Sequence, residues 1–348
     1  MKDKVKIGIA GTGMVAAFHA EAIRLIEHAG LERVYDKDVA RARAFAEKFN
    51  CRAAESLEDF LGSDIDIVCV ATPSGLHGCI AVPAARARKH IFCEKPLETT
   101  LEKAREIHNE CIKNNVLLSP VFPARYSAAA RTAREAVRAG RFGEPVLIGA
   151  SVRWYRKPEY YAESPWRGTW ALDGGGALMN QGIHAADLLR YFNGEIDELS
   201  ANTANRLHKT IEVEDTLMAS LRFRNGSLGY LESSTACAPG SKRKITFSGT
   251  RGGFVLEDDC LTLWNPADET PDDESIREWN RSGGNPGGGA GDPASISCSG
   301  HHSQLAELVR AVLRGSPLET PGIEGVKTVE LICAAYESAR TGKTVRLP

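Results

Sequence analysis

A lysine and a histidine that lie far apart in the sequence are the side chains best suited to move protons in this chain. Lys95 lies in the segment Cys-Glu-Lys-Pro at 93–96, and His184 lies in Gly-Ile-His-Ala-Ala-Asp at 182–187. A lysine ammonium can hydrogen-bond a reacting hydroxyl and stabilise the alkoxide charge that develops on it. Imidazole exchanges protons near neutral pH. Together with a glycine-rich turn near the N-terminus, the two residues indicate hydride-transfer chemistry on a hydroxyl group.

Each residue also has an ordinary structural interpretation. A lysine near a turn is most often a surface residue, and on its own this is the favoured interpretation of Lys95. A histidine within a helix is often buried with both ring nitrogens hydrogen-bonded. For His184 the preceding Asp-Gly-Gly-Gly at 173–176 shifts the balance, because three glycines let a cofactor or substrate approach the backbone closely. Asn180 and Asp187 fall on the same helical face as His184, at spacings of i, i+4 and i+7.

The glycine-rich turn has the form Gly11-x-Gly13-x-x-Ala16, between an expected strand and an expected helix. A dinucleotide fold needs these small residues for a tight turn, for close approach to a pyrophosphate and for helix packing, and the amides at the helix start face the phosphate charge. Asp36 ends the next strand at the distance expected of a ribose-binding carboxylate. A carboxylate there repels a 2′-phosphate, so NAD is favoured over NADP, although Lys37 could partly offset this effect.

Strands and helices alternate up to about residue 122, which favours a parallel sheet with crossover helices. Beyond this point neighbouring strands follow one another without helices, and Asn225-Gly226 favours a tight hairpin turn. We therefore predict an α/β protein with a doubly wound parallel sheet at 1–122 and an α+β domain with an antiparallel sheet at 123–348. Ser56 and Thr99, the latter with Glu102, are expected to cap helices. Strands are expected at 5–10, up to 36, 65–71, 90–93, 146–154, 216–223, 227–233, 244–247 and 253–256, and helices at 40–49, 176–192, 301–313 and 326–339.

Composition excludes several classes of protein. A length of 348 residues favours two domains, and a net charge of -2 gives no electrostatic reason to expect nucleic acid or an anionic membrane as a partner. The 9 cysteines include no Cys-x-x-Cys pair, which predicts reduced thiols, and no apolar run is long enough to cross a bilayer. Without a signal segment either, the expected location is the cytoplasm. No metal is expected, because no cluster has persuasive ligand spacing, and the glycine-rich stretch at 283–291 is predicted to be a mobile loop.

Two further groups of residues have two interpretations each. His77 follows the third expected strand, where it would lie near a cofactor or cap the start of a helix. Arginines and aromatic residues crowd the stretch from 153 to 170. They suit either a packed aromatic cluster or the binding of a sugar or nucleotide, and we weigh the two equally.

The motifs in combination resemble the Gfo/Idh/MocA oxidoreductase family, and the resemblance covers nearly the whole chain. The matching segments are the opening glycine turn, Thr-Pro at 72–73 with His77, Glu-Lys-Pro at 94–96, Arg-Tyr at 125–126, the glycine triplet with 182–187, and Ser-Ala-Arg-Thr-Gly-Lys at 338–343. The resemblance implies a Rossmann domain followed by a domain with an open, mostly antiparallel sheet. It also implies that Lys95 and His184 are the catalytic pair, and that a sheet face joins the chains of a homodimer or homotetramer.

Two positions depart from the commoner family pattern. Arg88 stands where members often have glycine, so the preceding helix must end differently. Asn180 stands where many sugar and inositol dehydrogenases have an aspartate, and an asparagine cannot act as a base. The segments 166–170 and 174–181 look more like the branch that oxidises the 3-hydroxyl of nucleotide-linked N-acetylamino sugar uronates.

The resemblance implies an oxidoreductase that transfers a hydride between a ring hydroxyl carbon and NAD, on a sugar, inositol-like or nucleotide-sugar substrate. Two alternatives are an NAD-dependent glycoside hydrolase of the same fold and a non-catalytic NAD-binding sensor. Retention of both Lys95 and His184 argues against the sensor. The expected cofactor-binding residues are Gly11, Thr12, Gly13, Met14, Val15, Asp36, Lys37, Ala71, Thr72, Pro73, His77, Glu94 and Lys95. The expected substrate-binding residues are Lys95, Arg153, Tyr155, Trp166, Arg167, Asn180, His184 and Asp187.

Overall fold

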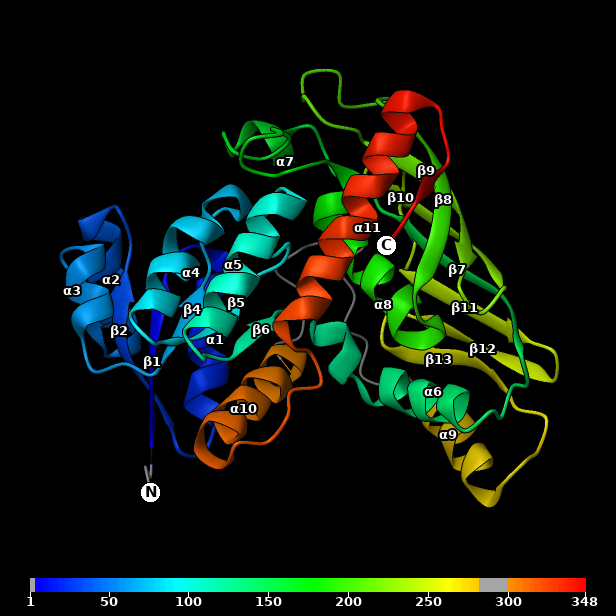
Figure 1. The fold of residues 1–348 in the computed structure, drawn as a ribbon, viewed down its shortest axis with the longest axis horizontal. Coiled ribbons are helices and arrows are strands. Elements are labelled where there is room, and N and C mark those ends of the chain that lie inside the picture. The colour runs from blue at the N-terminus through cyan, green and yellow to red at the C-terminus, as the bar shows by residue number, and fades with distance from the viewer. Residues whose placement is uncertain (1–3, 282–298) are drawn as a thin grey trace. The chain divides into compact units, whose positions relative to one another are not determined.

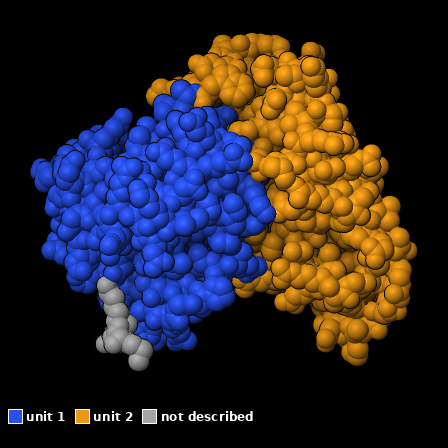
Figure 2. All heavy atoms as spheres, viewed as in Figure 1, with its two compact units in different colours: residues 1–123, 171–174, 298–329 blue, residues 124–170, 175–297, 330–348 orange. Residues whose placement is uncertain are grey.

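The computed structural model describes residues 4–281 and 299–348, so the glycine-rich stretch 283–291 lies outside the described residues. The chain divides into two compact units (Figure 2). Unit 1 comprises Met1–Pro123, Ala171–Gly174 and Cys298–Val329, and unit 2 comprises Ala124–Trp170, Gly175–Ser297 and Glu330–Pro348. The first change of unit lies one residue from the expected boundary at 122, and two later segments return to unit 1.

Unit 1 is built on a six-stranded parallel sheet with the order β3-β2-β1-β4-β5-β6. Its strands are β1 (Val5–Ala10), β2 (Ala29–Tyr35), β3 (Arg52–Ala53), β4 (Ile67–Val70), β5 (His90–Cys93) and β6 (Leu118–Pro120). Its helices are α1 (Met14–Leu25), α2 (Val39–Phe49), α3 (Leu57–Gly62), α4 (His77–Arg86), α5 (Leu101–Lys113) and α10 (Ser299–Arg314), with a 3-10 turn η1 (Ser74–Leu76). This is the predicted doubly wound sheet.

Alternation along β1 explains how the sheet of unit 1 is covered. Ile7 and Ile9 are fully buried in a core with residues of α1, α2 and α10. Gly8, between them, faces Phe60 of α3 on the other side, where a Cβ would lie 2.7 Å from the ring. Figure 1 shows α10 beside α1 and α5 beside α4. The strand order reverses between β1 and β4, and ligands of such sheets bind where the carboxyl ends of strands meet at this reversal.

Of the two helix caps predicted from the sequence in unit 1, one is confirmed and the other is wrong by one residue. The Ser56 hydroxyl accepts a hydrogen bond from the Asp59 amide at 3.1 Å, as predicted. The cap of α5 is Thr100 rather than Thr99, because the Thr100 hydroxyl accepts from the Lys103 amide at 3.3 Å. The Thr99 hydroxyl instead donates to Glu98 at 3.0 Å.

Unit 2 contains an eight-stranded sheet with the order β13-β12-β11-β7-β10-β9-β8-β14. The strands are β7 (Pro145–Arg153), β8 (Ile196–Ala204), β9 (Thr216–Phe223), β10 (Leu228–Ser234), β11 (Lys244–Gly249), β12 (Gly252–Glu257), β13 (Cys260–Asn265) and β14 (Val345–Arg346). The pairing is antiparallel except between β7 and β10. Gly226 takes a φ of 88° in the predicted hairpin between β9 and β10. The predicted fold class is confirmed.

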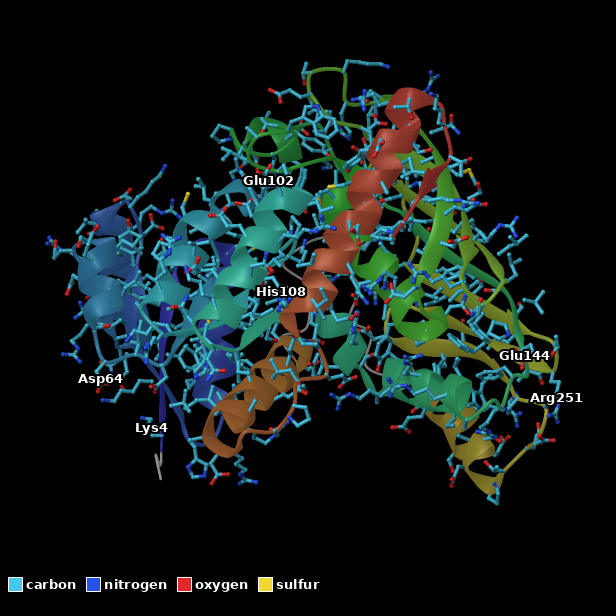
Figure 3. The ribbon with its side chains drawn as sticks, in the orientation of Figure 1. Lys4, Asp64, Glu102, His108, Glu144 and Arg251 are labelled. Carbon is cyan, nitrogen blue, oxygen red and sulfur yellow. The ribbon has the colours of Figure 1, made fainter. Side chains whose placement is uncertain are left out.

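The two faces of this sheet differ. Ile148 of β7 and Phe247 of β11 belong to the buried face, which packs against α8 (Ile183–Asn193) and the π-helical turn η3 (Ala177–Gly182). The other helices among the described residues are α6 (Ala128–Arg138), α7 (Glu159–Ala162), α9 (Pro271–Arg281) and α11 (Gly322–Thr341), with the 3-10 turn η2 (Pro123–Tyr126). Glu144 and Arg251 lie at one edge of unit 2 (Figure 3). The Thr250 amide donates to the Glu144 carbonyl there at 2.9 Å, which joins the turn between β11 and β12 to the start of β7.

Candidate functional site

The turn between β1 and α1 has the geometry of an anion-binding helix start. Gly11 has a φ of 98°, and a Cβ there would lie 2.5 Å from the Ala71 carbonyl oxygen, so only glycine fits. A Cβ at Gly13 would meet no described atom within 4 Å, and Met14 beside it is 48% exposed. No described side chain caps the first amides of α1. These amides are therefore available to a pyrophosphate.

Asp36 stabilises this turn directly. Its Oδ2 accepts from the Thr12 amide at 3.0 Å and from the Thr12 hydroxyl at 2.6 Å, while Oδ1 accepts from the Asp38 amide at 3.0 Å. Asp36 is 9% exposed. The carboxylate thus lies beside the glycine turn, as the sequence predicts, and also fixes the conformation of that turn.

The loop after β4 lies beside the same turn. The amide of Ala71 donates to the Ala10 carbonyl at 2.8 Å. The buried hydroxyl of Thr72 has no hydrogen-bond partner among the described residues, so it can bond a ligand. A dinucleotide fits both the uncapped amides and this hydroxyl.

His77 joins two loops rather than reaching into open space. Its Nδ1 lies 2.9 Å from the Pro96 carbonyl oxygen and its Nε2 lies 3.0 Å from that of Thr72. Burial lowers the pKa of His77, and the neutral ring donates to one of the two oxygens. His77 therefore holds the loop after β4 against the loop after β5.

Lys95 follows β5 at the carboxyl edge of the sheet. Burial lowers the pKa of Lys95, opposed by the charges of Glu94 and Asp173. Asp173 is 1% exposed and, like Lys95, belongs to unit 1. A lysine whose pKa is lowered, and which feels the charges of two carboxylates, can donate a proton or hydrogen bond to an oxygen substituent and take a proton back.

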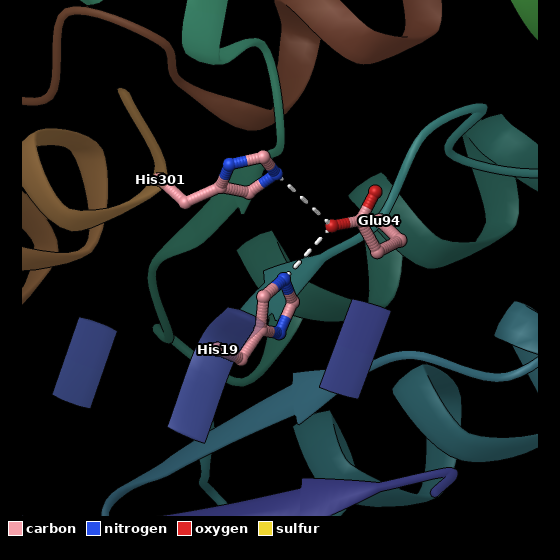
Figure 4. Close-up of side chains that lie close together, drawn as sticks. All are labelled: His19, Glu94 and His301. Atoms are coloured by element: carbon pink, nitrogen blue, oxygen red, sulfur yellow. Dashed lines mark hydrogen bonds and ion pairs between the residues drawn. The ribbon is translucent and has the colours of Figure 1, made fainter. Parts of the chain in front are cut away.

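Glu94 is hydrogen-bonded to a histidine that sequence analysis did not select (Figure 4). Its Oε1 lies 2.8 Å from His19 Nε2 and 3.7 Å from His301 Nε2. Burial raises the pKa of Glu94, but the hydrogen bond from His19 and the nearby positive charges outweigh it and lower the pKa to about 2. Burial lowers the pKa of His301 to about 4. The Glu94 carboxylate is thus turned toward the two histidines, and its Oε2 accepts from the Lys95 amide at 3.2 Å.

Among the described residues this is the one group of three potential metal ligands, whose candidate atoms lie within 4.8 Å of one another. The separation of 2.8 Å between His19 and Glu94 is that of a direct hydrogen bond. We therefore describe the group as a hydrogen-bonded network, and the expected absence of a metal stays a prediction.

His184 lies in the first turn of α8, directly after the π-helical turn that carries Asn180. The expected continuous helix from 176 to 192 is thus π-helical in its first part, which changes the angle between the two side chains. Asp187, one turn further, is bound by a bidentate ion pair to Arg125, with distances of 2.7 and 2.6 Å. Both members are buried, so Asp187 binds α8 to η2 within unit 2.

The glycine triplet is surrounded by protein atoms, not by the cofactor or substrate that the sequence suggests. A Cβ at Gly174 would lie 2.7 Å from Thr99, both in unit 1. A Cβ at Gly175 would lie 2.2 Å from the Tyr336 hydroxyl, and one at Gly176 would lie 1.7 Å from the Glu214 carbonyl oxygen. Glycine is therefore needed here for close packing of the chain on itself.

The arginine and aromatic residues of unit 2 form stacked pairs. The guanidinium of Arg167 lies 4.2 Å from the centre of the Tyr160 ring and 5.7 Å from that of Trp166. Arg153 forms an ion pair with Glu232 at 2.8 Å and is 59% exposed, while Tyr155 forms an isolated bridge with Ala236. The stacked cluster is present, and a role in ligand binding stays a prediction.

Gln181 is a residue that sequence analysis missed as a candidate. Its amide nitrogen donates to the Tyr160 hydroxyl at 3.2 Å, and its buried Oε1 has no partner among the described residues. The side chain can therefore accept a hydrogen bond from a ligand hydroxyl. No signal in the sequence separates Gln181 from an ordinary helix glutamine.

The parallel sheet with its open glycine turn and the half-buried lysine are the features of a dinucleotide-dependent oxidoreductase. Residues 5–122 match the family model described as "Oxidoreductase family, NAD-binding Rossmann fold", and residues 130–255 match the "GFO/IDH/MocA C-terminal domain". The chain belongs to the Gfo/Idh/MocA family, and its N-terminal part is an NAD-binding Rossmann fold.

Several relatives match the whole chain. The WlbA dehydrogenase from Bordetella pertussis, solved in complex with NADH and UDP-GlcNAcA, is 31% identical, with a TM-score of 0.92 and coverage of 100% of this chain and 99% of that one. The WlbA dehydrogenase from Chromobacterium violaceum, with the same ligands, is 32% identical, with a TM-score of 0.89 and coverage of 99% and 96%. Myo-inositol 2-dehydrogenase from Thermotoga maritima is 29% identical, with coverage of 99% and 98%.

Within residues 4–281 and 299–348, no helix combines the length and the apolar composition needed to cross a bilayer.

Proposed function

We propose that this protein is an NAD-dependent dehydrogenase that oxidises the 3-hydroxyl of a UDP-linked N-acetylamino sugar uronate. The observation that carries the proposal is the likeness, over the whole length of both chains, to a dehydrogenase solved with NADH and UDP-GlcNAcA. The segment Trp-Arg-Gly-Thr-Trp at 166–170 adds support, since sequence analysis assigned it to the same branch.

We assign cofactor binding to residues 1–122. The amides of Gly11 to Val15 would hold the pyrophosphate, and Asp36, with Lys37 beside it, would bind the adenosine ribose. The loop at 71–73 and the segment at 94–95 would line the nicotinamide side, where the unpartnered Thr72 hydroxyl supplies a donor. His77 keeps these two loops together.

Bound NAD would supply the hydride acceptor for oxidation of the carbinol carbon of the substrate. Lys95 would hydrogen-bond the reacting hydroxyl and stabilise the alkoxide charge as the carbon–hydrogen bond breaks. The carboxylates of Glu94 and Asp173 favour the charged form of this lysine, and burial opposes it. Lys95 can therefore donate to the oxygen without holding its proton too tightly.

His184 would take the hydroxyl proton, because neutral imidazole is a suitable base near neutral pH. Asn180 would orient the substrate through its amide, which can donate and accept hydrogen bonds but cannot ionise. The ion pair with Arg125 occupies both oxygens of Asp187, so we assign this residue to holding α8 rather than to the substrate.

Substrate binding and self-association fall to residues 123–348. The planar groups of Arg153, Tyr155, Trp166 and Arg167 suit the base and the phosphates of a nucleotide sugar.

Unit 2 also presents an open sheet face whose apolar side chains are 46 to 55% exposed, namely Leu147, Met218, Leu228 and Leu263. The strand register places these residues on the face opposite to Ile148 and Phe247. Exposed apolar surface of this kind marks an interface, here with further copies of this chain as a homodimer or homotetramer. A cytoplasmic location is proposed on the spacing of the cysteines alone.

Turnover on a panel of compounds tests the proposal. The purified protein is incubated with NAD and UDP-GlcNAcA, and separately with free N-acetylglucosamine, myo-inositol and levoglucosan, while nicotinamide absorbance is followed. UDP-GlcNAcA should give the highest kcat/KM. Higher kcat/KM with myo-inositol or levoglucosan would contradict the assigned substrate. Phenol release from a nitrophenyl N-acetylhexosaminide without net NADH would favour the glycoside hydrolase instead.

A further inference from the structure

The first amides of the turn that leads to His184 are all bound by two residues distant in sequence. The Gly176 and Leu178 amides donate to the two carboxylate oxygens of Glu214, each at 2.9 Å. The Ala177 amide donates to the Glu214 carbonyl oxygen at 3.0 Å, and the Met179 amide donates to the Tyr336 hydroxyl at 3.2 Å. The first amides of a helix have no partner within the helix. Here two remote residues satisfy four consecutive ones.

Tyr336 and Glu214 are also bound to each other. The Tyr336 hydroxyl donates to Glu214 Oε1 at 3.0 Å, so the phenol and the carboxylate are held together as a pair. The backbone beside this pair must be glycine, because side chains at Gly175 and Gly176 would collide with the Tyr336 hydroxyl and with the Glu214 carbonyl oxygen. Two glycines of the triplet are thus explained by the need to admit these two residues.

We infer that Glu214, together with Tyr336, is a positioning residue that fixes the π-helical turn 177–182 and hence the orientation of Asn180 and His184. Its effect on turnover rests on the proposed role of His184, whereas its effect on the turn does not. We call Glu214 and Tyr336, which bind the four amides of residues 176–179, the cap of this turn. The next amide, that of Asn180, is the first to bond within the turn, because it donates to the Gly176 carbonyl at 3.0 Å. A shift of the turn therefore moves Asn180 first and α8 next.

The cap depends on the charge of the carboxylate. Burial raises the pKa of Glu214 to about 7, while hydrogen bonds from the Leu178 and Gly176 amides and from Tyr336 act in the opposite direction. A protonated carboxyl group must use one oxygen as a donor, so it can no longer accept from every partner. The hold on the turn should weaken as pH falls through about 7.

A cavity of about 580 Å³ in unit 2 is lined in part by Glu214 and Tyr336, and we take it as the route by which solvent protons reach the carboxyl group. Its other ionisable lining groups are Glu212 from the same loop and Cys333, Glu337 and Arg340 from α11. The neighbouring Asp215 carboxylate is turned to the amides of residues 206–208. Of the groups lining this cavity, Glu214 is the one whose carboxylate contacts the π-helical turn.

The test uses the full-length protein with NAD and compares Glu214→Gln and Tyr336→Phe with Glu337→Gln. Glu337 lines the same cavity but is exposed, so its variant controls for a lost charge nearby. Backbone hydrogen exchange at 176–179 should accelerate by about 10-fold or more in Glu214→Gln, because a glutamine offers one acceptor oxygen in place of two. Protection of these amides, corrected for intrinsic exchange, should fall below about pH 7 in the unmodified protein and be independent of pH in Glu214→Gln.

Turnover is measured on the same samples with UDP-GlcNAcA. We expect kcat to fall on the order of 100-fold in Glu214→Gln with KM changed much less, since a small misplacement of a reacting group costs about this much. Tyr336→Phe keeps the ring and loses one hydroxyl, so it should fold and show a smaller loss of kcat. The inference would be overturned if Glu214→Gln left hydrogen exchange at 176–179 unchanged. It would also be overturned if exchange became faster in Glu214→Gln while its kcat stayed within about 2-fold of that of Glu337→Gln. An unmodified protein that turns over no substrate would refute the proposed function, while the exchange data would still decide the cap.

Discussion

Arg125 and Asp187 form a buried bidentate ion pair, with Arg125 Nε and Nη2 at 2.7 and 2.6 Å from the two carboxylate oxygens. The two side chains are 3% and 1% exposed, so neither charge has water as an alternative partner. The pair joins η2 to α8, the helix that carries His184. A residue that the sequence places on the substrate face is thus engaged in holding that helix.

Removal of one partner should be strongly destabilising. Asp187→Asn and Arg125→Met each remove one partner of a buried ion pair, which typically costs about 3–5 kcal/mol. The double variant should lose less than the sum of the two single losses. Urea denaturation of the four proteins measures this, and single losses below about 1 kcal/mol would show that the pair is not structural.

Asp36 should decide cofactor preference. Asp36→Ala should weaken NAD binding by about 1–3 kcal/mol and reduce discrimination against NADP, because ribose hydroxyls lose their acceptor. The control is Thr12→Val, which removes the hydroxyl that bonds Asp36 at 2.6 Å but keeps the carboxylate. It should leave the ratio of NAD to NADP affinity unchanged. Titration calorimetry would contradict this account if the unmodified protein bound both cofactors equally, since Lys37 would then outweigh Asp36.

Stability should decline in mild acid because of His301. Burial lowers the pKa of His301 in the folded protein to about 4, from an ordinary histidine value of 6.5. Below pH 6.5 the unfolded chain binds this proton more readily than the folded protein does. The free energy of unfolding is therefore highest above pH 6.5 and decreases as pH falls toward 4, by up to about 3 kcal/mol. His301→Gln should flatten the decline between these two pH values, and His302→Gln, its neighbour, should not. Identical pH profiles of the two variants in thermal unfolding would contradict this prediction.

Lys95 and His184 should divide the proton chemistry between them. Lys95→Ala and His184→Ala should each lower kcat roughly 100- to 10,000-fold, and leave NAD affinity largely intact, because the role proposed for each is at the reacting hydroxyl. The double variant should lose much less than the product of the two single losses if both residues have the proposed roles in one transition state. Near-normal turnover of His184→Ala would make His184 a structural helix residue and leave Lys95 as the sole candidate for proton transfer.

Sequence patterns predicted those features that depend on local chemistry. Strand β1 at Val5–Ala10 and strand β5 at His90–Cys93 have the predicted bounds, because a buried parallel strand reads as a continuous apolar run. Arg88, which stands where the family often has glycine, takes a φ of 57° at the end of α4 and so adopts the left-handed conformation itself. The family resemblance supplied Lys95, which local patterns alone would have left as a surface residue.

Contacts between distant segments were not predictable from local patterns. His301 lies 282 positions after His19 in the chain, and only the packing of α10 against α1 brings both to Glu94. The hydrogen bonds from the amides at the start of the π-helical turn to Glu214 and Tyr336 also join distant segments, and no hydrophobic period in 176–192 reveals them. The parallel pairing of β7 with β10 was likewise not predictable, because the alternation of apolar and polar residues along a strand does not show which other strand lies beside it.

Transfer of an isotope label tests the central claim most directly. UDP-GlcNAcA carrying deuterium at carbon 3 is incubated with the protein and NAD, and the nucleotide products are separated and analysed by NMR and mass spectrometry. The account predicts deuterium at C4 of the nicotinamide and a ketone at carbon 3 of the sugar, with both signals lost in Lys95→Ala. Oxidation that leaves the deuterium on the sugar, or no oxidation of this substrate by the unmodified protein, would contradict it.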